Sequence, residues 1–356
     1  MIDIIHWTIY YIKCLFNIII SYFSNNNIVE TTNIKAINTH LRIVRLKGSY
    51  FDMGIDYGRI MKNILKLDVK KYYHYITRNQ SIHNKRIPVH LRKTYITKSL
   101  LNLYNMNESN FNVNLINFMK GVSKGSGINF EKLLCVNLFT DLMDNHCILM
   151  SKKIKGKILN LRTLDYGLPN LTHTLIVFHP NNMTPYCSLN ISCVFGIVSG
   201  ISKNGMFFGE TYHDNILGEI SYNGMPFHHM AHNILGTCKN IDEAYNIMKN
   251  INRTSNLELM IGDSDGSIIY LFNKDKLILK DSYYTVTPNE RENFYKNEKY
   301  LDSIENVIKK FIPKTKSGEL HCIVTYDGYL YVSVTTNFKQ SYNNDFYKFK
   351  ISQLFK

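Results

Sequence analysis

The sequence predicts an α+β protein in which strands and helices are grouped rather than alternating. Before Cys147 the apolar residues mainly have helical spacing, and after Cys147 short β-rich runs dominate. Strands followed by helices and then by more strands are typical of antiparallel sheets, whereas parallel sheets need alternating strands and helices. The chain has 356 residues, of which 45% are hydrophobic and 20% are charged. It is therefore long enough for two domains, or one large one, with a substantial core.

The segment before Cys147 begins with a strand and continues as helices. Residues 41–46 alternate between apolar and other side chains, as a strand does, and residues 51–61 have helical spacing. Gly54 and Gly58 lie four apart on one face of that helix, which permits close approach of a neighbouring backbone. Residues 62–120 continue the helical pattern, with weak breaks near residues 84–88 and 105–110.

Turn and cap residues divide the rest of the chain into short elements. Asn129 is placed to cap a helix that leads toward Cys147, and Asp242 and Glu243 suit the first turn of a later helix. The expected strands are 147–151, 158–164, 175–179, 192–199, 206–211, 257–262, 267–272, 277–279, 284–287, 321–326 and 329–335. The expected helices after Cys147 are 226–235, 241–251 and 296–310.

The N-terminus divides into an apolar segment, residues 1–23, and a polar linker, residues 24–40. The apolar part, residues 4–23, fits a signal peptide or anchor, an amphipathic membrane-surface helix or an N-terminal core helix. The first two interpretations imply membrane association through residues 4–23. They favour a secretory or membrane-associated protein over a cytoplasmic one.

Charge and cysteine content restrict the function. The formal net charge is +14, but the basic residues are scattered, and the chain is rich in Asn, Ile, Lys and Tyr, whose codons are AT-rich. Genome composition explains this basicity, so no nucleic-acid partner is expected. The seven cysteines contain no CxxC pair and are an odd set, which argues against a disulfide scaffold and against a zinc site. Cys187 and Cys193 are expected to be free buried thiols rather than a disulfide.

Cys147 stands out because an arginine and an aspartate lie at hairpin spacing from it. It opens an apolar run, residues 151–157 form a lysine-rich turn, and a second apolar run carries Arg162 and Asp165. A hairpin of this length returns the second strand beside the first. An Arg can then lie near the sulfur and an Asp near the backbone nitrogen of the cysteine, which suits an N-terminal nucleophile. Arg162 and Asp165 point to opposite faces of a regular strand, so a local twist or bulge after Arg162 is expected if both serve the site.

His228 and His232 offer a different site. Four residues apart on a helix, they share one face, as metal ligands do. No Glu lies between them and no third ligand is evident, so a structural or substrate-lining role is favoured and no metal or other cofactor is expected.

Four ordered stretches resemble one protein family. They are residues 48–58 with three spaced glycines, residues 121–137 with GVSKGSG followed by LLCVN, Cys147 with RTLDYG at 162–167, and the tail at 320–355. The chain resembles the acyl-coenzyme A:6-aminopenicillanate acyltransferase (isopenicillin-N N-acyltransferase) family of autoproteolytic cysteine N-terminal nucleophile (Ntn) hydrolases. Acid ceramidase and bile-salt hydrolase are more distantly similar.

The resemblance implies an αββα Ntn-hydrolase sandwich made as a precursor, a zymogen. Its mainly helical segment, residues 41–146, would precede a catalytic segment, residues 147–356, and autocatalytic cleavage between His146 and Cys147 would leave two associated pieces. Cys147 would be the thiol nucleophile, activated by its own α-amine.

The same resemblance implies roles for other residues. Arg162 would favour the thiolate, Asp165 would orient the α-amine, and the Asn289 side chain would bind the oxyanion. The backbone near Thr211 and Tyr212 would supply the second oxyanion donor, and Asn256 would line the pocket.

The implied activity is that of an amidase or N-acyltransferase acting on C–N amide bonds through a Cys147 thioester. Its substrate would be a small amide or acyl-amino compound, with acyl-coenzyme A as a further candidate, and the acceptor would be water or an amine. His146, Ile148 and Thr163 depart from the family's usual residues. They motivate the alternative of a catalytically degenerate Ntn-fold binding protein, secreted or membrane-associated.

Overall fold

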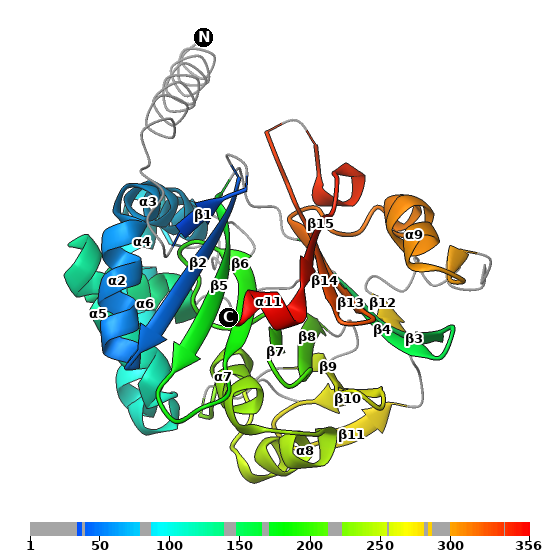
Figure 1. Cartoon of the computed structure of the whole chain (residues 1–356). Helices are drawn as coiled ribbons and strands as arrows, with labels where there is room; N and C mark the ends of the chain where they lie inside the picture. The colour runs from blue at the N-terminus through cyan, green and yellow to red at the C-terminus, as the bar shows by residue number, and fades with distance from the viewer. Residues whose placement is uncertain are drawn as a thin grey trace.

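Two β-sheets form the centre of the molecule, and helices cover their outer faces (Figure 1). The structure, a computed structural model, describes residues 34–37, 40–78, 87–138, 147–165, 171–212, 223–254, 256–280, 284–286, 300–337 and 339–356. The α+β class predicted from the sequence is confirmed.

The larger sheet contains nine strands drawn from both sides of Cys147. The strand order is β1-β2-β5-β6-β7-β8-β9-β10-β11. Strands β2 and β5 are parallel, and the other neighbouring pairs are antiparallel. The strands are β1 (Ile34–Ala36), β2 (Leu41–Gly48), β5 (His173–Pro180), β6 (Tyr186–Ile191), β7 (Ser199–Ser202), β8 (Phe207–Tyr212), β9 (Leu257–Gly262), β10 (Ser267–Phe272) and β11 (Leu277–Lys280). The segment before Cys147 is therefore joined to the segment after it by backbone pairing.

The smaller sheet is antiparallel and contains the hairpin that begins at Cys147. Its order is β12-β3-β4-β13-β14-β15. The strands are β12 (Tyr284–Val286), β3 (Cys147–Ile154), β4 (Lys157–Leu164), β13 (His321–Tyr326), β14 (Tyr329–Val334) and β15 (Tyr347–Lys350). Lys155 and Gly156 both have positive φ, 48° and 80°, the conformation of a two-residue hairpin turn. The predicted hairpin is confirmed.

Side-chain caps mark the starts of several helices, among them α2, α5, α6 and α8. Ser49 accepts the Asp52 N–H at the start of α2, and Asn129 accepts the Lys132 N–H at the start of α6. The helices are α2 (Tyr50–Ile60), α3 (Lys62–Arg78), α4 (Val89–Asn107), η2 (Glu108–Asn110), α5 (Val113–Ser126), α6 (Phe130–Leu138), α7 (Phe227–Thr237), α8 (Ile241–Asn250), α9 (Ile304–Asn306), η6 (Val307–Phe311), α10 (Ile312–Thr315), η7 (Ser341–Asn343) and α11 (Ile351–Leu354).

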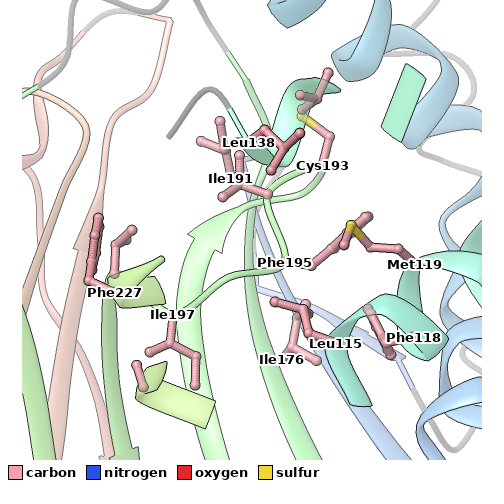
Figure 2. Close-up of a cluster of buried hydrophobic side chains, with 14 of the residues drawn as sticks. Leu115, Phe118, Met119, Leu138, Ile176, Ile191, Cys193, Phe195, Ile197 and Phe227 are labelled. Carbon is pink, nitrogen blue, oxygen red and sulfur yellow. The ribbon is translucent and has the colours of Figure 1, made fainter. Parts of the chain in front are cut away.

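Three apolar cores separate four layers. The largest lies between α2–α8 and the outer face of the nine-stranded sheet, where Phe118 of α5 and Ile176 of β5 face each other (Figure 2). A second core lies between the two sheets, with Val177 from the larger sheet and Leu149 and Ile323 from the smaller one. A third covers the smaller sheet's other face with the helical turns of residues 304–312. The layers are helix, sheet, sheet, helix, as an αββα sandwich requires.

Helices α2 and α5 cross with their backbones in direct contact. A Cβ added at Gly54 or Gly121 would overlap a carbonyl oxygen of the opposite helix, and the same holds at Gly58 and Gly125. Glycine is therefore required at these positions by the space between the two backbones. The close approach expected from the spacing of Gly54 and Gly58 is confirmed.

Two expectations are wrong. Residues 192–198, expected within a strand over 192–199, are not a strand, and only Ser199 belongs to one, β7. Their backbone groups bond elsewhere: the Phe195 N–H donates to the Asn137 side chain, and the Ile197 N–H donates to the His228 carbonyl. Residues 34–36, expected within the polar linker, instead form β1 and pair with β2. Backbone hydrogen bonding, which hydrophobic pattern does not reveal, decides both cases.

The expected N-terminal apolar segment, residues 1–23, and most of the expected linker lie outside the described residues. Within the described ranges, no helix combines the length and the apolar character that crossing a bilayer demands.

Helix α7 buries three histidines completely. His232 contacts the Tyr186 hydroxyl through Nδ1 at 2.7 Å and the Phe195 carbonyl through Nε2 at 2.9 Å. The His228 and His229 rings lie with their centroids 4.7 Å apart. Burial lowers the pKa of His228 to about 3 and that of His232 to about 4. These rings are therefore neutral at pH 7, and protonating them opposes folding.

We expect Gly121→Ala to destabilise the fold by about 1–3 kcal/mol, because the added methyl group forces α2 and α5 apart. Urea unfolding measures the change. Gly266→Ala is the matched control, because a Cβ at Gly266 meets no atom within 4 Å and its φ is not positive. Equal free energies of unfolding for the two variants would contradict the tight crossing.

We expect stability to fall as the pH drops below 6.5. Above pH 6.5 His228 is neutral in both states; below it, the unfolded chain binds a proton that the folded chain binds only near pH 3. Linkage gives a loss of about 2 kcal/mol at pH 5 for this residue.

His228→Leu should therefore reduce the pH dependence of the unfolding free energy between pH 7.5 and 5. His90→Leu, at an exposed position of α4, controls for the loss of a histidine. Identical pH slopes for the wild type and His228→Leu would refute the burial argument.

Candidate active site

The register of β3, β4 and β13 places the predicted residues on two opposite faces of the smaller sheet. Cys147 pairs with Leu164, and Leu149 pairs with Arg162. Directly paired residues share a face and faces alternate along a strand, so Cys147 and Arg162 lie on the same face. That face is the one turned toward the larger sheet, because Leu149 belongs to the core between the sheets.

Cys147 is the first residue of β3 and is completely buried. Burial raises the pKa of its thiol to about 12, and the Arg162 charge and a hydrogen bond from the Asp165 backbone N–H offset only part of this effect. The negative charges of Glu210 and Asp165 act in the same direction as burial. The Cys147 thiol is therefore protonated at neutral pH.

Arg162 is held by side-chain and backbone groups from two other strands, β8 and β13. Its Nη2 pairs with the Glu210 carboxylate of β8, and neither side chain is exposed to solvent. Its Nε donates to the Glu210 carbonyl at 3.3 Å, and its Nη1 contacts Nε2 of His321 on β13 at 3.2 Å. Ser199 of β7 contacts the same His321 nitrogen at 3.1 Å. These contacts join the two sheets beside Cys147.

His321 takes part in this network as a neutral ring. Burial, together with the charge of Arg162 and the nearby His173, places its pKa well below the usual value. Arginine can only donate, so Nε2 of His321 is the acceptor and its proton is carried by Nδ1. The neutral ring thus adds a hydrogen bond to Arg162 without adding a charge.

Asp165 follows the last residue of β4 and points to the other side of the sheet. Its carboxylate accepts the backbone N–H groups of Gly318 and Glu319, and the Ser317 hydroxyl at 2.8 Å. The bulge expected after Arg162 is absent, because the β3–β4 register runs unbroken from Cys147–Leu164 to the turn. The end of the strand, together with the 317–319 loop, places the carboxylate instead.

The remaining predicted residues divide into those the structure describes and those it does not. Thr211 and Tyr212 end β8, and Asn256 immediately precedes β9, with Tyr212 opposite Leu257. Thr211 and Asn256 are buried, whereas Tyr212 is partly exposed. Thr211 and Tyr212 directly follow Glu210, the partner of Arg162, along β8. His146 and Asn289 lie outside the described residues.

Sequence reasoning missed Glu210 and Ser317. Glu210 interrupts the apolar strand Phe207–Tyr212, and a charged residue in a buried strand is expected to have a charged partner. That signal could have identified it. Ser317 has no such signal, because it is a loop serine that approaches Asp165 only through the fold.

The α7 histidines are arranged as packing residues. Both ring nitrogens of His232 are used by Tyr186 and Phe195. The described ranges contain no group of three or more His, Cys, Asp or Glu side chains that could hold a metal ion. Arg253 is also structural: it donates to the Met248 carbonyl near the end of α8 and to the Asn273 carbonyl that follows β10.

The family resemblance is confirmed by a family model. The model described as "Acyl-coenzyme A:6-aminopenicillanic acid acyl-transferase" matches residues 152–309. The matched part begins within β3 and contains Arg162, Asp165 and Glu210. The chain thus resembles this family over residues 152–309, whereas Cys147, Ser317 and His321 lie outside the matched part.

Two curated relatives come from Dictyostelium discoideum. Protein dcd1B is 27% identical over 263 residues, which is 67% of this chain and 52% of that protein. Protein dcd1A is 26% identical over 162 residues, 41% of this chain and 36% of that protein. The chain's matches therefore span about half of the first relative's length and about a third of the second's.

Solved structures with some similarity include two amide-cleaving enzymes. Penicillin V acylase from Agrobacterium tumefaciens is 10% identical with a TM-score of 0.36, covering 53% of this chain and 83% of that chain. The Caenorhabditis elegans orthologue of N-acylethanolamine-hydrolyzing acid amidase is 12% identical with a TM-score of 0.36, covering 51% and 92%.

We expect Glu210→Leu to lower the free energy of unfolding by about 3–5 kcal/mol, because it leaves the Arg162 charge buried without its partner. Urea denaturation measures the loss. Glu305→Ala, which breaks the solvent-exposed Glu305–Lys309 pair, is the control and should leave stability unchanged within error. A Glu210→Leu variant as stable as this control would show that the buried pair is dispensable.

Proposed function

We propose that this chain is a cysteine Ntn amidohydrolase or N-acyltransferase that activates itself by cutting the bond between His146 and Cys147. The observation that carries the proposal is the position of Cys147. It is the first residue of a central strand, with Arg162 on its own face of the sheet and the Asp165 N–H on its sulfur. A nucleophile that must expose its own α-amine needs this location at a strand start. The family-model match over residues 152–309 supports the same class.

Self-cleavage would use the thiol before any amine exists. The Cys147 sulfur would add to the His146 carbonyl carbon, and the bond from that carbon to the Cys147 nitrogen would break. The nitrogen takes up a proton, and water then hydrolyses the thioester. Because burial keeps the thiol protonated, its proton must leave as the sulfur adds. The buried Arg162 charge would stabilise the developing sulfur anion.

The freed α-amine of Cys147 would then act as the general base. Such an amine has a pKa of roughly 7.7–8.0, which suits proton transfer near neutral pH. It would take the thiol proton as the sulfur attacks the substrate's amide carbon, and would return that proton to the leaving amine. Asp165, immobilised by three donors, would hold the amine in place.

The acyl group would then rest on Cys147 as a thioester. Attack by water would release an acid, and attack by an amine would form a new amide. Asn289 and the backbone near Thr211 and Tyr212 would bind the oxyanion, with Asn256 lining the pocket. The substrate class that fits is a small amide or acyl-amino compound, with acyl-coenzyme A as a candidate acyl donor.

The two pieces would remain associated after cleavage. Strand β2 lies before the cut and pairs along its whole length with β5, which lies after it. Residues pair at both ends of the two strands, Leu41 with His173 and Gly48 with Pro180. Separation would expose both strands and the largest core.

A non-catalytic binding protein on the same fold is the second candidate. Complete burial and a thiol pKa of about 12 describe an unreactive cysteine, and this observation favours the alternative for as long as the chain stays uncut. Cleavage itself therefore distinguishes the two candidates.

The deciding experiment is intact mass spectrometry of the purified protein. We expect the wild type to yield two pieces that meet between His146 and Cys147, and Cys147→Ala to remain one chain. Cys193→Ala, which alters another buried cysteine, should be cut as the wild type is. A wild type that remains uncut under conditions in which it is folded would refute the enzyme proposal and favour the binding protein.

A further inference from the structure

A chain of hydrogen bonds runs from the residue after Cys147 to Asp165. The Ile148 N–H donates to Oγ1 of Thr163 at 3.0 Å. Thr163 Oγ1 lies 2.5 Å from Oγ of Ser317, and Ser317 donates to Oδ2 of Asp165 at 2.8 Å. These bonds link the backbone amide that follows Cys147 to the Asp165 carboxylate through two hydroxyl groups.

The chemistry of the groups fixes the direction of these bonds. The Ile148 amide can only donate, and the Asp165 carboxylate can only accept. Ser317 has one proton and gives it to Asp165, so Thr163 must give its own proton to Ser317. All donors therefore point from Ile148 toward Asp165, and bonds aligned in this way strengthen one another.

The hydroxyl groups lie where water cannot replace them. Thr163 and Ser317 are completely buried. The loop that carries Ser317 is also held in one conformation. The Ser317 N–H donates to Oγ1 of Thr315, and the flanking Lys316 and Gly318 have positive φ of 52° and 100°. A Cβ at Gly318 would overlap the Cys322 sulfur. The conformation of this loop therefore places the Ser317 hydroxyl against the Asp165 carboxylate.

The two ends of this series of hydrogen bonds both contact the surroundings of Cys147. At one end the Ile148 N–H belongs to the peptide plane that follows Cys147. At the other, Asp165 contacts the Cys147 sulfur through its backbone N–H and carries the carboxylate expected to hold the new α-amine. Losing either hydroxyl would release one end while leaving Cys147, Arg162 and Glu210 in place.

We propose that Thr163 and Ser317 are positioning residues for the Cys147 reaction, acting together through Asp165 and the Ile148 amide. This inference rests on the proposed function, because the reaction they serve is that of Cys147. It also accounts for Thr163, whose departure from the family's usual residue becomes the first link of a hydroxyl chain.

The test measures the cut between His146 and Cys147 over time by intact mass spectrometry in the full chain. Ser317→Ala and Thr163→Val should each slow the cut by on the order of 10- to 100-fold, as small displacements of reacting groups do. Thr163→Ser keeps the hydroxyl and should stay within a few-fold of the wild type. The Thr163→Val/Ser317→Ala double variant should be no slower than the slower single variant, because both break one chain.

Ser126→Ala is the matched control. Ser126 is completely buried in α5 and donates to the Val122 carbonyl at 2.7 Å, so its loss removes a buried serine hydroxyl bond without changing a contact of Asp165 or of the 317–319 loop. It should be cut at the wild-type rate. Thermal unfolding of every variant separates slow cutting from loss of fold, and Thr163→Ser preserves the test if Thr163→Val does not fold.

Wild-type cutting rates in Ser317→Ala and Thr163→Val, or equal slowing in Ser126→Ala, would overturn the positioning role alone. Independent, multiplying effects in the double variant would also overturn it, because the hydroxyls would not then act as one chain. A wild type that is not cut at all would overturn the proposed function and this inference together.

Discussion

The buried ion pair between Arg162 and Glu210 is the constraint on which the site depends. Neither side chain reaches solvent, so each charge requires the other, and Arg162 lies on the smaller sheet while Glu210 lies on the larger. The pair therefore fixes how the two sheets meet beside Cys147. The fit is tight: a Cβ at Gly209 would lie 3.0 Å from Leu149 and 3.1 Å from Arg162.

Successive side chains of β4 point to opposite faces of the smaller sheet, so the site residues of this strand lie on two faces. Arg162 faces the larger sheet and brings positive charge to the side where the Cys147 sulfur lies. Thr163 contacts the Ile148 amide and the 317–319 loop, and Asp165 contacts the same loop. The Arg162 charge on one face and the Thr163 contact to the Ile148 amide on the other can thus both act on Cys147.

The helical layer contributes by holding the larger sheet in place. The glycine contacts hold α2 and α5 together, and the Tyr57 hydroxyl of α2 donates to the Ser192 carbonyl at 2.7 Å. Strand β2 continues directly into this layer through Gly48 and Ser49. The segment before Cys147 therefore supports the sheet that supplies Glu210.

The sequence alone determined the α+β class, the β3–β4 hairpin, the capped helices and the glycine crossing. Each depends on local signals: apolar period, turn residues, caps and the size of a side chain. It also singled out Cys147, Arg162 and Asp165, because their spacing and the family motifs lie within one hairpin.

Only the tertiary structure decided which groups surround those residues. Glu210, Ser199, Ser317 and His321 come from strands and loops distant in sequence, and no local pattern records which of them will face Arg162 or Asp165. The same reason explains the irregular segment 192–198, whose backbone bonds to Asn137 and α7 rather than to a strand. Long-range hydrogen bonds and buried charges are satisfied only when the layers pack, so the partners of a site residue are a property of the assembled fold.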